Sequence, residues 1–337
     1  METLHDTYNK DSTLSANHLL TIIMAVYNAQ SFLATAIDSV LAQSMSDFEL
    51  ILVNDGSSDK SGIICKEYEQ RDNRIVYIEK ENEGVAIARN CALNVAKGKY
   101  VMFVDSDDIL YPGTLTAICS AMEENKCDIL RFEFNTIDEY GKILYPNYEG
   151  KRKKKYDKQI FTPSDYILKI LCNEFYLCMN VFRKGILDKH KLRFVEGCSY
   201  MEDCEFIIRF LIVSSVCGYS SFVGYGYRKY STSATASLTE KKYNDILFVF
   251  NNIVQTWENI NNTKLKKAIR YVYEGIGLFI YKKTFLFDDF SNRNKIVSLC
   301  TVKPVRLEWI LFGISKNKFW YIIELLRKIY NHLFYKH

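Results

Sequence analysis

The sequence predicts an α/β fold built on a mostly parallel sheet. Short apolar runs that suit buried strands alternate with segments of helical periodicity over residues 19–104. Two of these runs end abruptly in acidic residues, at the position where open α/β sheets bind their ligands. The chain has 337 residues, of which 48% are hydrophobic, so it is long enough to bury a sizeable core.

Each element follows from its local pattern. Apolar runs bounded by polar turn residues predict strands, and residues such as Leu33, Ile37 and Val40 fall on one face of a helix. Pro112 suits the first position of a later helix. The predicted strands are 19–26, 48–53, 74–78, 100–104 and 127–134, the predicted helices are 31–44, a segment ending near residue 70, 84–96, 112–125 and one headed by Asp203, and 141–158 is predicted to be a hairpin or flap. The basic run 151–155 in that flap is either a solvated loop or a contact for phosphate groups of an acceptor or membrane.

The run 100–104 leads directly into three carboxylates, Asp105, Asp107 and Asp108. Acids this close repel each other unless a cation lies among them, and a hard divalent cation with oxygen ligands is the natural partner. The alternative is an acidic turn or helix cap, because Asp is common in both.

Asp55 follows the strand 48–53, and Asp105 follows the strand 100–104. Because the carboxyl ends of parallel strands meet at one edge of a sheet, the two acids are expected to lie close together. The segment 54–59 suits a turn and a helix N-cap, but Asp55 is also placed to accept a hydrogen bond from a ligand. Further on, Gly84 permits close backbone approach at the start of a helix that carries Arg89. Arg89 is either a residue facing the site or a solvated helix charge.

Four segments together resemble glycosyltransferase family 2. They are Thr-Ile-Ile-Met-Ala-Val-Tyr-Asn at 21–28, Val-Asn-Asp-Gly-Ser-Ser-Asp at 53–59, Asn-x-Gly-x-x-x-Ala-Arg-Asn at 82–90 and Val-Asp-Ser-Asp-Asp at 104–108. Their order and spacing match that family, and four linked motifs are far more specific than one. The resemblance implies a GT-A fold, which is a Rossmann-like mixed sheet flanked by helices, here with a C-terminal helical extension. It also implies a nucleotide-diphosphate sugar donor and a divalent metal.

The resemblance implies a role for each matching residue. Asp55 would bind the donor's base, Asp105 would approach the ribose, and Arg89 would lie near the base or phosphates. Asp107, with Asp108, would hold Mn²⁺ or Mg²⁺ against the diphosphate. The residues that the resemblance assigns to donor binding are Ala25, Tyr27, Asp55, Arg89, Asp105 and Arg228. Ala25 stands where the family usually has proline, and Arg228 is either a contact to the diphosphate or part of a surface loop.

Glu202 and Asp203 open a helix, where acids are favourable for the helix alone. The resemblance implies a Glu-Asp pair here with Asp203 as the catalytic base, which suits an inverting transfer. Glu202 is the alternative base. With Asp203 as the base, Glu202 would contact the acceptor, and residues 173–182 and 199–202 would line the acceptor pocket.

The chain is predicted to have four parts: a disordered tail (1–17), a nucleotide-sugar-binding part (18–115), an acceptor-binding part of the same domain (116–235) and a helical region (236–337). The segment 315–337 forms a basic amphipathic stripe, which fits a membrane surface, the protein's own core or a second copy in a homodimer. The net charge of +4 does not argue for nucleic acid. No signal peptide or membrane span is expected, so the predicted location is cytoplasmic, with a peripheral position on the inner face of the membrane as a hypothesis.

The predicted function is therefore inverting transfer of a hexosyl or N-acetylhexosaminyl group from a nucleotide-diphosphate sugar. UDP is the favoured nucleotide, and the expected acceptor is a glycan or lipid-linked hydroxyl in surface polysaccharide synthesis. One alternative is a nucleotide-sugar-binding partner without activity. The other is a nucleotidyltransferase, although residues 25–29 do not supply its usual glycine-rich triphosphate loop.

Overall fold

The computed structural model describes residues 18–146, 153–230, 238–284, 292 and 296. The chain divides into two compact units, Met1–Ala236 and Ser237–His337. Several predictions lie wholly or partly outside the described residues: the tail at 1–17, the flap at 141–158, the start of the basic run at 151–152, the helical region at 236–337 and the amphipathic stripe at 315–337.

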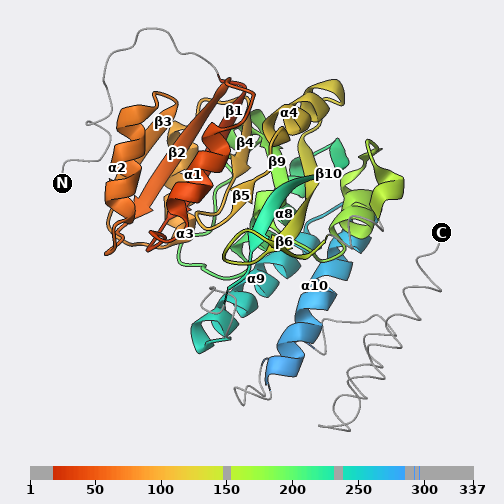
Figure 1. Ribbon diagram of the computed structural model, residues 1–337. Coiled ribbons are helices and arrows are strands. Elements are labelled where there is room, and N and C mark those ends of the chain that lie inside the picture. The colour runs from red at the N-terminus through yellow and green to blue at the C-terminus, as the bar shows by residue number, and fades with distance from the viewer. Residues whose placement is uncertain (1–17, 147–152, 231–237, 285–291, 293–295, 297–337) are drawn as a thin grey trace. The chain divides into compact units, whose positions relative to one another are not determined.

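The first hundred described residues alternate strands and helices as predicted (Figure 1). All eight residues of the second strand, Phe48–Asp55, are buried, so the sheet is covered on both faces. In Figure 1, helix α1 lies in front of the strands β1 and β2. In chain order these elements are β1 (Leu20–Val26), α1 (Leu33–Leu41), β2 (Phe48–Asp55), α2 (Ser61–Arg71), β3 (Ile75–Lys80), α3 (Val85–Val95) and β4 (Tyr100–Phe103).

The register of the parallel strands places their carboxyl ends at one edge. Val26 at the end of β1 pairs with Asn54 of β2, and Ile23 pairs with Phe103 at the end of β4. The loops that follow β1, β2 and β4 therefore emerge side by side, which is the arrangement predicted for Asp55 and Asp105.

The remaining strands make the sheet mixed. The strand order is β3-β2-β1-β4-β9-β6-β10-β5, with β7 beside β6 and β8 beside β10. Strand β9 is antiparallel to both β4 and β6, whereas β6 and β10 are parallel. The further elements of this unit are β5 (Ile109–Leu110), α4 (Thr114–Glu124), β6 (Ile129–Ile137), β7 (Ile143–Tyr145), η1 (Lys154–Tyr156), β8 (Ile160–Phe161), α6 (Pro163–Asp165), the π-helical η2 (Tyr166–Leu171), η3 (Leu177–Met179), β9 (Asn180–Arg183), α7 (Lys184–Lys189), α8 (Glu202–Val213) and β10 (Cys217–Arg228).

One local prediction was wrong. Helix α4 begins at Thr114 after Gly113, whose φ of 80° is a left-handed conformation, so Pro112 precedes the helix. The predicted hairpin or flap at 141–158 lies partly outside the described residues; in the described part, β7 pairs antiparallel with β6, and η1 covers Lys154–Tyr156. The basic residues of η1, Lys154 and Lys155, are exposed.

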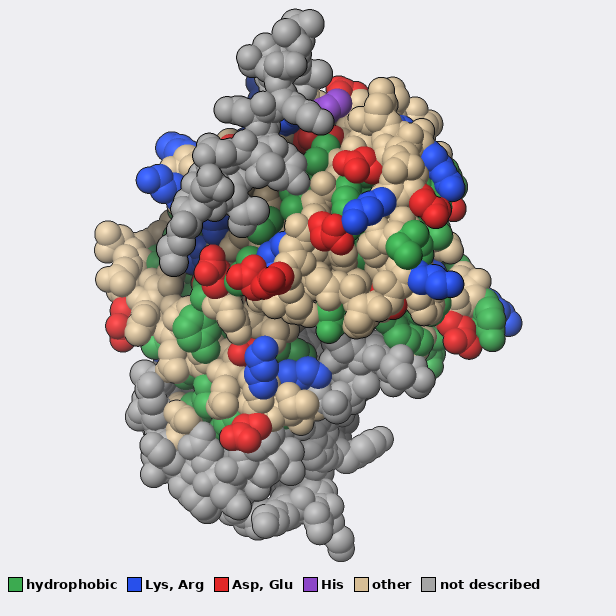
Figure 2. All heavy atoms as spheres, turned by 90° about the vertical axis from the view of Figure 1, so that its left-hand side faces the viewer, with side chains coloured by type: hydrophobic (Ala, Val, Ile, Leu, Met, Phe, Trp, Pro, Cys, Tyr) green, Lys and Arg blue, Asp and Glu red, His purple; other side chains and the backbone are tan. Residues whose placement is uncertain are grey.

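On the described part of the face in Figure 2, acidic and basic side chains are interspersed. Ion pairs on the surface of the described residues include Lys66 with Glu79 at 2.8 Å and Arg71 with Glu67 at 3.3 Å. Exposed pairs of this kind contribute little to the free energy of unfolding.

The described part of the second unit consists of two helices, α9 (Glu240–Glu258) and α10 (Thr263–Thr284). The Thr239 side chain caps α9 by accepting a hydrogen bond from the Lys242 backbone N–H. The two helices pack through aromatic rings, with Trp257 and Phe250 of α9 against Tyr273 of α10 at 5.4 and 6.2 Å. The predicted C-terminal helices are thus present. Within the described ranges, no helix has the length and apolar character needed to cross a bilayer.

Candidate active site

Asp55 is the last residue of β2 and is held by the loop that follows β3. Its Oδ1 accepts hydrogen bonds from Lys80 Nζ at 2.8 Å and from the Glu83 N–H at 3.1 Å, and its Oδ2 accepts one from the Gly84 N–H at 2.8 Å. Gly84 has a φ of 96°, which glycine adopts without strain. Because each carboxylate oxygen can accept two hydrogen bonds, Oδ2 keeps one acceptor position for a ligand N–H.

The acidic loop after β4 is fixed by the segment that ends β10. The Tyr230 hydroxyl donates a hydrogen bond to Asp107 Oδ2 at 2.9 Å, and the Arg228 backbone N–H donates one to Asp108 Oδ1 at 2.6 Å. Asp108 is 1% exposed, and its Oδ2 has no hydrogen-bond partner among the described residues. Burial and the charges of Asp105 and Asp107 raise the pKa of Asp108 well above its usual value. Burial, with the charge of Asp105, also raises the pKa of Asp107.

The ligand atoms gathered here suit a hard cation. One carboxylate oxygen each from Asp105 and Asp108 lies within 4.8 Å of the other and of the Cys178 sulfur. Burial and the nearby acids raise the pKa of the Cys178 thiol well above its usual value, so the thiol stays protonated and carboxylates remain as the charged donors. Carboxylate oxygens, with one of them lacking any partner, fit Mg²⁺ or Mn²⁺. The Asp107 carboxylate is not in this group, and contacts Tyr230 instead.

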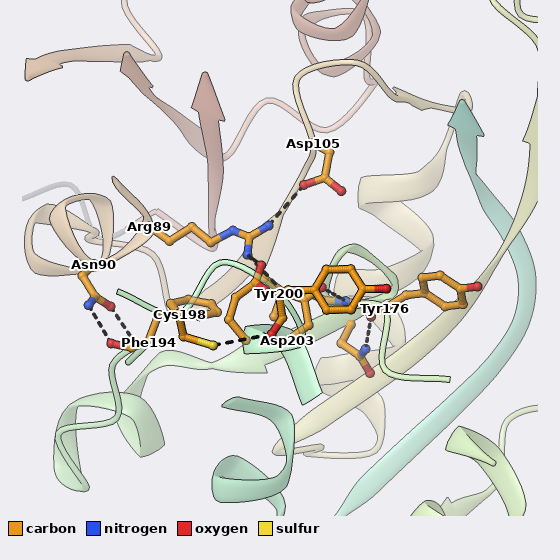
Figure 3. Close-up of polar contacts among 11 residues, drawn as sticks. Arg89, Asn90, Asp105, Tyr176, Phe194, Cys198, Tyr200 and Asp203 are labelled. Carbon is orange, nitrogen blue, oxygen red and sulfur yellow. Dashed lines mark hydrogen bonds and ion pairs between the residues drawn. The ribbon is translucent and has the colours of Figure 1, made fainter. Parts of the chain in front are cut away.

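Arg89 links the acidic loop to the helix that carries the predicted base (Figure 3). Its guanidinium lies 3.3 Å from Asp105 Oδ1, 2.9 Å from Glu202 Oε1 and 3.1 Å from Asp203 Oδ1. It also packs over the Phe194 ring, with 5.3 Å from Cζ to the ring centroid. Burial alone would lower the pKa of Arg89, but the three acids outweigh it, and the pKa is raised. Arg89 is thus buried against three acids and is not a solvated helix charge.

Asp203 lies in the first turn of α8, after Met201, whose φ is 63°. Its Oδ2 accepts a hydrogen bond from the Leu177 N–H at 3.3 Å, on the far side from Arg89. Burial raises the pKa of Asp203 well above its usual value, the charge of Glu202 raises it further, and Arg89 opposes both. A carboxylate whose pKa is moved toward neutrality is suited to accept a proton.

The remaining predicted donor residues lie at or near the same edge. Ala25 pairs with Val53 near the end of β1, and the Tyr27 side chain is 54% exposed just beyond it. Arg228 is buried, and its guanidinium donates to the backbone oxygens of Asp107, Asp138 and Glu139 at 2.6, 3.0 and 2.6 Å. Its guanidinium thus holds the acidic loop against the end of β6.

Sequence reasoning did not assign a role to several residues that shape the site. Tyr230 orients Asp107, and Phe194 lies under Arg89. Leu177 was predicted only as part of the pocket lining 173–182, and its backbone N–H donates to Asp203. Asn90 exchanges two hydrogen bonds with the backbone of Phe194, at 2.9 and 2.8 Å, and so fixes that ring (Figure 3). Only Asn90 carried a signal in the sequence, because it closes the third motif.

The family of this chain is established by comparison. The family model for Glycosyl transferase family 2 matches residues 21–190, a range that contains the four motifs around Ala25, Asp55, Arg89 and Asp105. The chain therefore belongs to glycosyl transferase family 2, and the resemblance drawn from its motifs is confirmed.

A solved structure shows the same fold. The TarS 1–349 structure of S. aureus in complex with UDP-GlcNAc superposes with a TM-score of 0.61 at 20% sequence identity, covering 86% of this chain and 79% of that one. The predicted GT-A fold is confirmed by this likeness.

Two relatives of known sequence align with this chain over only part of their own length. The Minor teichoic acid biosynthesis protein GgaB of Bacillus subtilis (strain 168) is 30% identical over 266 residues, which is 77% of this chain and 29% of GgaB. The uncharacterized glycosyltransferase EpsJ of the same organism is 32% identical over 194 residues, which is 56% of this chain and 54% of EpsJ. The chain thus spans about a third to a half of the length of these two relatives.

Proposed function

We propose that this chain is an inverting, metal-dependent glycosyltransferase that transfers a sugar from a UDP-sugar to a hydroxyl group. The observation that carries this proposal is the position of Arg89. It contacts Asp105 of the acidic loop at 3.3 Å and Asp203 of α8 at 3.1 Å. A donor bound along Asp55 and Asp105 would therefore present its sugar near Asp203.

In the proposed reaction, Asp203 is the general base. The acceptor hydroxyl gives its proton to the Asp203 carboxylate as its oxygen attacks the anomeric carbon. The bond from that carbon to the diphosphate breaks on the opposite face, so the anomeric configuration inverts and a nucleoside diphosphate leaves. Asp105 and Asp108, whose oxygens lie together, would hold Mn²⁺ or Mg²⁺, and the family resemblance adds Asp107, which here contacts Tyr230. The metal would offset the charge developing on the leaving diphosphate.

The donor and acceptor are proposed by analogy with relatives. The TarS structure contains UDP-GlcNAc, and GgaB is named for minor teichoic acid biosynthesis. We therefore propose a UDP-hexose or UDP-N-acetylhexosamine as the donor and a glycan or lipid-linked acceptor of surface polysaccharide synthesis. Transfer to a soluble protein and to none of these acceptors would contradict the acceptor assignment.

Nucleotide binding can be tested by thermal unfolding of the full chain with UDP, GDP, CDP or dTDP, each with and without Mn²⁺. A ligand that binds the native state raises the melting temperature by mass action. We expect the largest shift with UDP, and we expect Mn²⁺ to increase it in the wild type but not in Asp107→Asn. A shift of the same size for all four nucleotides would contradict the choice of UDP, and one unchanged by Mn²⁺ would contradict the metal role.

The role of Asp203 can be tested with Asp203→Asn. The amide cannot accept the acceptor's proton, so kcat for transfer should fall by about 10²–10⁴-fold while the Kd for UDP changes little. Asp188→Asn is a matched control, because Asp188 is 45% exposed and pairs with Lys184 four residues away on α7. Equal activity in Asp203→Asn and the control would exclude Asp203 as the base.

A further inference from the structure

A second cluster of charges lies beneath the loop that contacts Asp203. Arg131 of β6 is fully buried and donates to the Glu174 backbone oxygen and to its Oε2, both at 2.9 Å. Lys153 is 4% exposed, and its Nζ donates to the same Oε2 at 2.8 Å. Arg131 also pairs with the buried Glu133, with 4.0 Å between Nε and Oε1, so two buried cations share two carboxylates, and both cations contact Glu174. Burying charged side chains costs free energy, so buried ion pairs are weak evidence that a protein is stabilised by them. We therefore ask whether these ion pairs position the loop that carries Glu174.

The loop that carries Glu174 has a conformation that requires support. The π-helical η2 ends at Cys172 with a φ of 49°, and Asn173 follows with a φ of 69°. Two consecutive residues other than glycine in the left-handed region are strained, and such strain persists only where surrounding contacts over-determine the backbone. The contacts of Glu174 with Arg131 and Lys153 lie directly after this strained pair.

The carboxyl end of the loop, at Tyr176, is also fixed by contacts, and it leads directly to Asp203. Asn180 Nδ2 donates to the Tyr176 backbone oxygen at 2.7 Å, and the Tyr176 ring packs against Phe134 with 5.3 Å between ring centroids. The next residue, Leu177, donates its N–H to Asp203 Oδ2 at 3.3 Å (Figure 3). Only two residues, Phe175 and Tyr176, therefore separate the partly buried Glu174 from the donor that contacts Asp203.

We propose that Arg131 and Lys153, acting through Glu174, position the loop 172–177 so that the Leu177 N–H orients the Asp203 carboxylate toward the acceptor. Arg131, Lys153 and Glu174 are positioning residues in this arrangement, because none of them contacts Asp203. The inference rests on the proposed role of Asp203 as the base.

If the loop 172–177 orients Asp203, its position should affect how kcat for sugar transfer depends on pH. The groups that act on Asp203 are Arg89, Glu202, Asp105 and the Leu177 N–H, and the thiols of Cys178 and Cys204 also lie near its charge. The hydrogen bond from Leu177 stabilises the charged carboxylate and lowers the pKa of Asp203. Release of the loop removes this contribution, so the pKa of Asp203 rises and the acidic limb of the kcat profile moves to higher pH.

The test compares Glu174→Gln with Glu123→Gln in the full chain. Glu123 pairs with Lys99 on the surface and is 43% exposed, so it is a matched control for loss of the charge alone. We expect Glu174→Gln to lower kcat for transfer by about tenfold, to leave the Kd for UDP within about twofold, and to shift the acidic limb upward. Glu123→Gln should match the wild type. Wild-type kcat and pH profile in folded Glu174→Gln would overturn the inference.

A second measurement remains informative if Glu174→Gln does not fold. In the wild-type chain, the amide resonance of Leu177 should titrate with the ionisation of Asp203, and this titration should vanish in Asp203→Asn. Lys153→Gln, which removes the smaller of the two cations, should weaken the same titration. A Leu177 resonance that does not respond to pH in the wild type would overturn the inference. Activity retained in Asp203→Asn would instead contradict the proposed base, so the two failures are distinguishable.

Discussion

At the scale of single residues, Asp108 combines burial with a carboxylate oxygen that has no partner among the described residues. Its pKa is raised in the folded protein by burial and by Asp105 and Asp107. The folded chain therefore binds more protons than the unfolded chain between the ordinary carboxyl pKa and the raised one. The free energy of unfolding falls as pH rises through that window.

Asp108→Asn should remove this dependence, because the amide is uncharged at every pH and keeps the oxygen that accepts from Arg228. In EDTA at about pH 7.5, we expect the variant to melt a few degrees above the wild type, and the difference to shrink toward about pH 5. Added Mn²⁺ should stabilise the wild type and not the variant. Thermal melts across pH check this, and a variant that melts below the wild type at both pH values would contradict it.

The sequence was enough to place the acids and Arg89 but not the residues that orient them. Asp55, Asp105 and Arg89 belong to local motifs with fixed spacing. Tyr230, Phe194 and Leu177 contribute one hydroxyl, one ring face and one backbone N–H. The first two lie more than a hundred residues from their partners, and Leu177 lies 26 residues from Asp203. Such contacts form only when distant segments pack together in the folded protein, so no local sequence pattern predicts them.

At the scale of elements, the turn after β2 depends on a close approach between two loops. Gly56 has a φ of 69°, and a Cβ built there would lie 2.6 Å from the backbone nitrogen of Asn82. That nitrogen belongs to the segment whose N–H groups at Glu83 and Gly84 hold Asp55. Side-chain bulk at residue 56 would therefore displace the donors that fix Asp55.

Gly56→Ala should lower the free energy of unfolding by about 2–3 kcal/mol, through left-handed strain and the steric overlap. It should also weaken UDP binding, since Asp55 would lose its fixed orientation. Gly185→Ala is the control, because Gly185 lies in α7 with nothing within 4 Å of the added Cβ. Urea unfolding and UDP titration check both variants. Equal stability of the two would show that the loops move apart without cost.

The helices and strands that the sequence predicted correctly were those with a clear pattern of apolar residues. Strands β1 and β2 are continuous apolar runs, and their bounds agree with prediction to within two residues. Strand β9 was instead taken as part of a pocket lining, because Asn180–Arg183 is only four residues long and carries no alternation. Its assignment comes from its place between β4 and β6, which is a property of the whole sheet.

At the scale of the whole molecule, every described site residue lies in the first compact unit, Met1–Ala236. The membrane hypothesis concerns only the segment 315–337. A chain truncated after residue 310 should therefore keep the UDP-dependent thermal shift and lose binding to liposomes of anionic lipid, if the basic stripe is the anchor. Liposome sedimentation with neutral vesicles as the control checks this. Equal binding by the truncated and full chains would assign the anchor elsewhere.

The sheet order has a consequence for how the chain is made. Strand β4, which leads into the acidic loop, has β1 on one side and β9 on the other. At roughly 5–20 residues per second, a ribosome delivers β9 several seconds after β4, and until then one edge of β4 lacks its strand partner. An unpaired edge is a template for aggregation. If translation stalls before β9 has been made, the nascent chain should bind chaperones. If translation stalls after Arg183 has left the ribosome, the nascent chain should no longer bind chaperones.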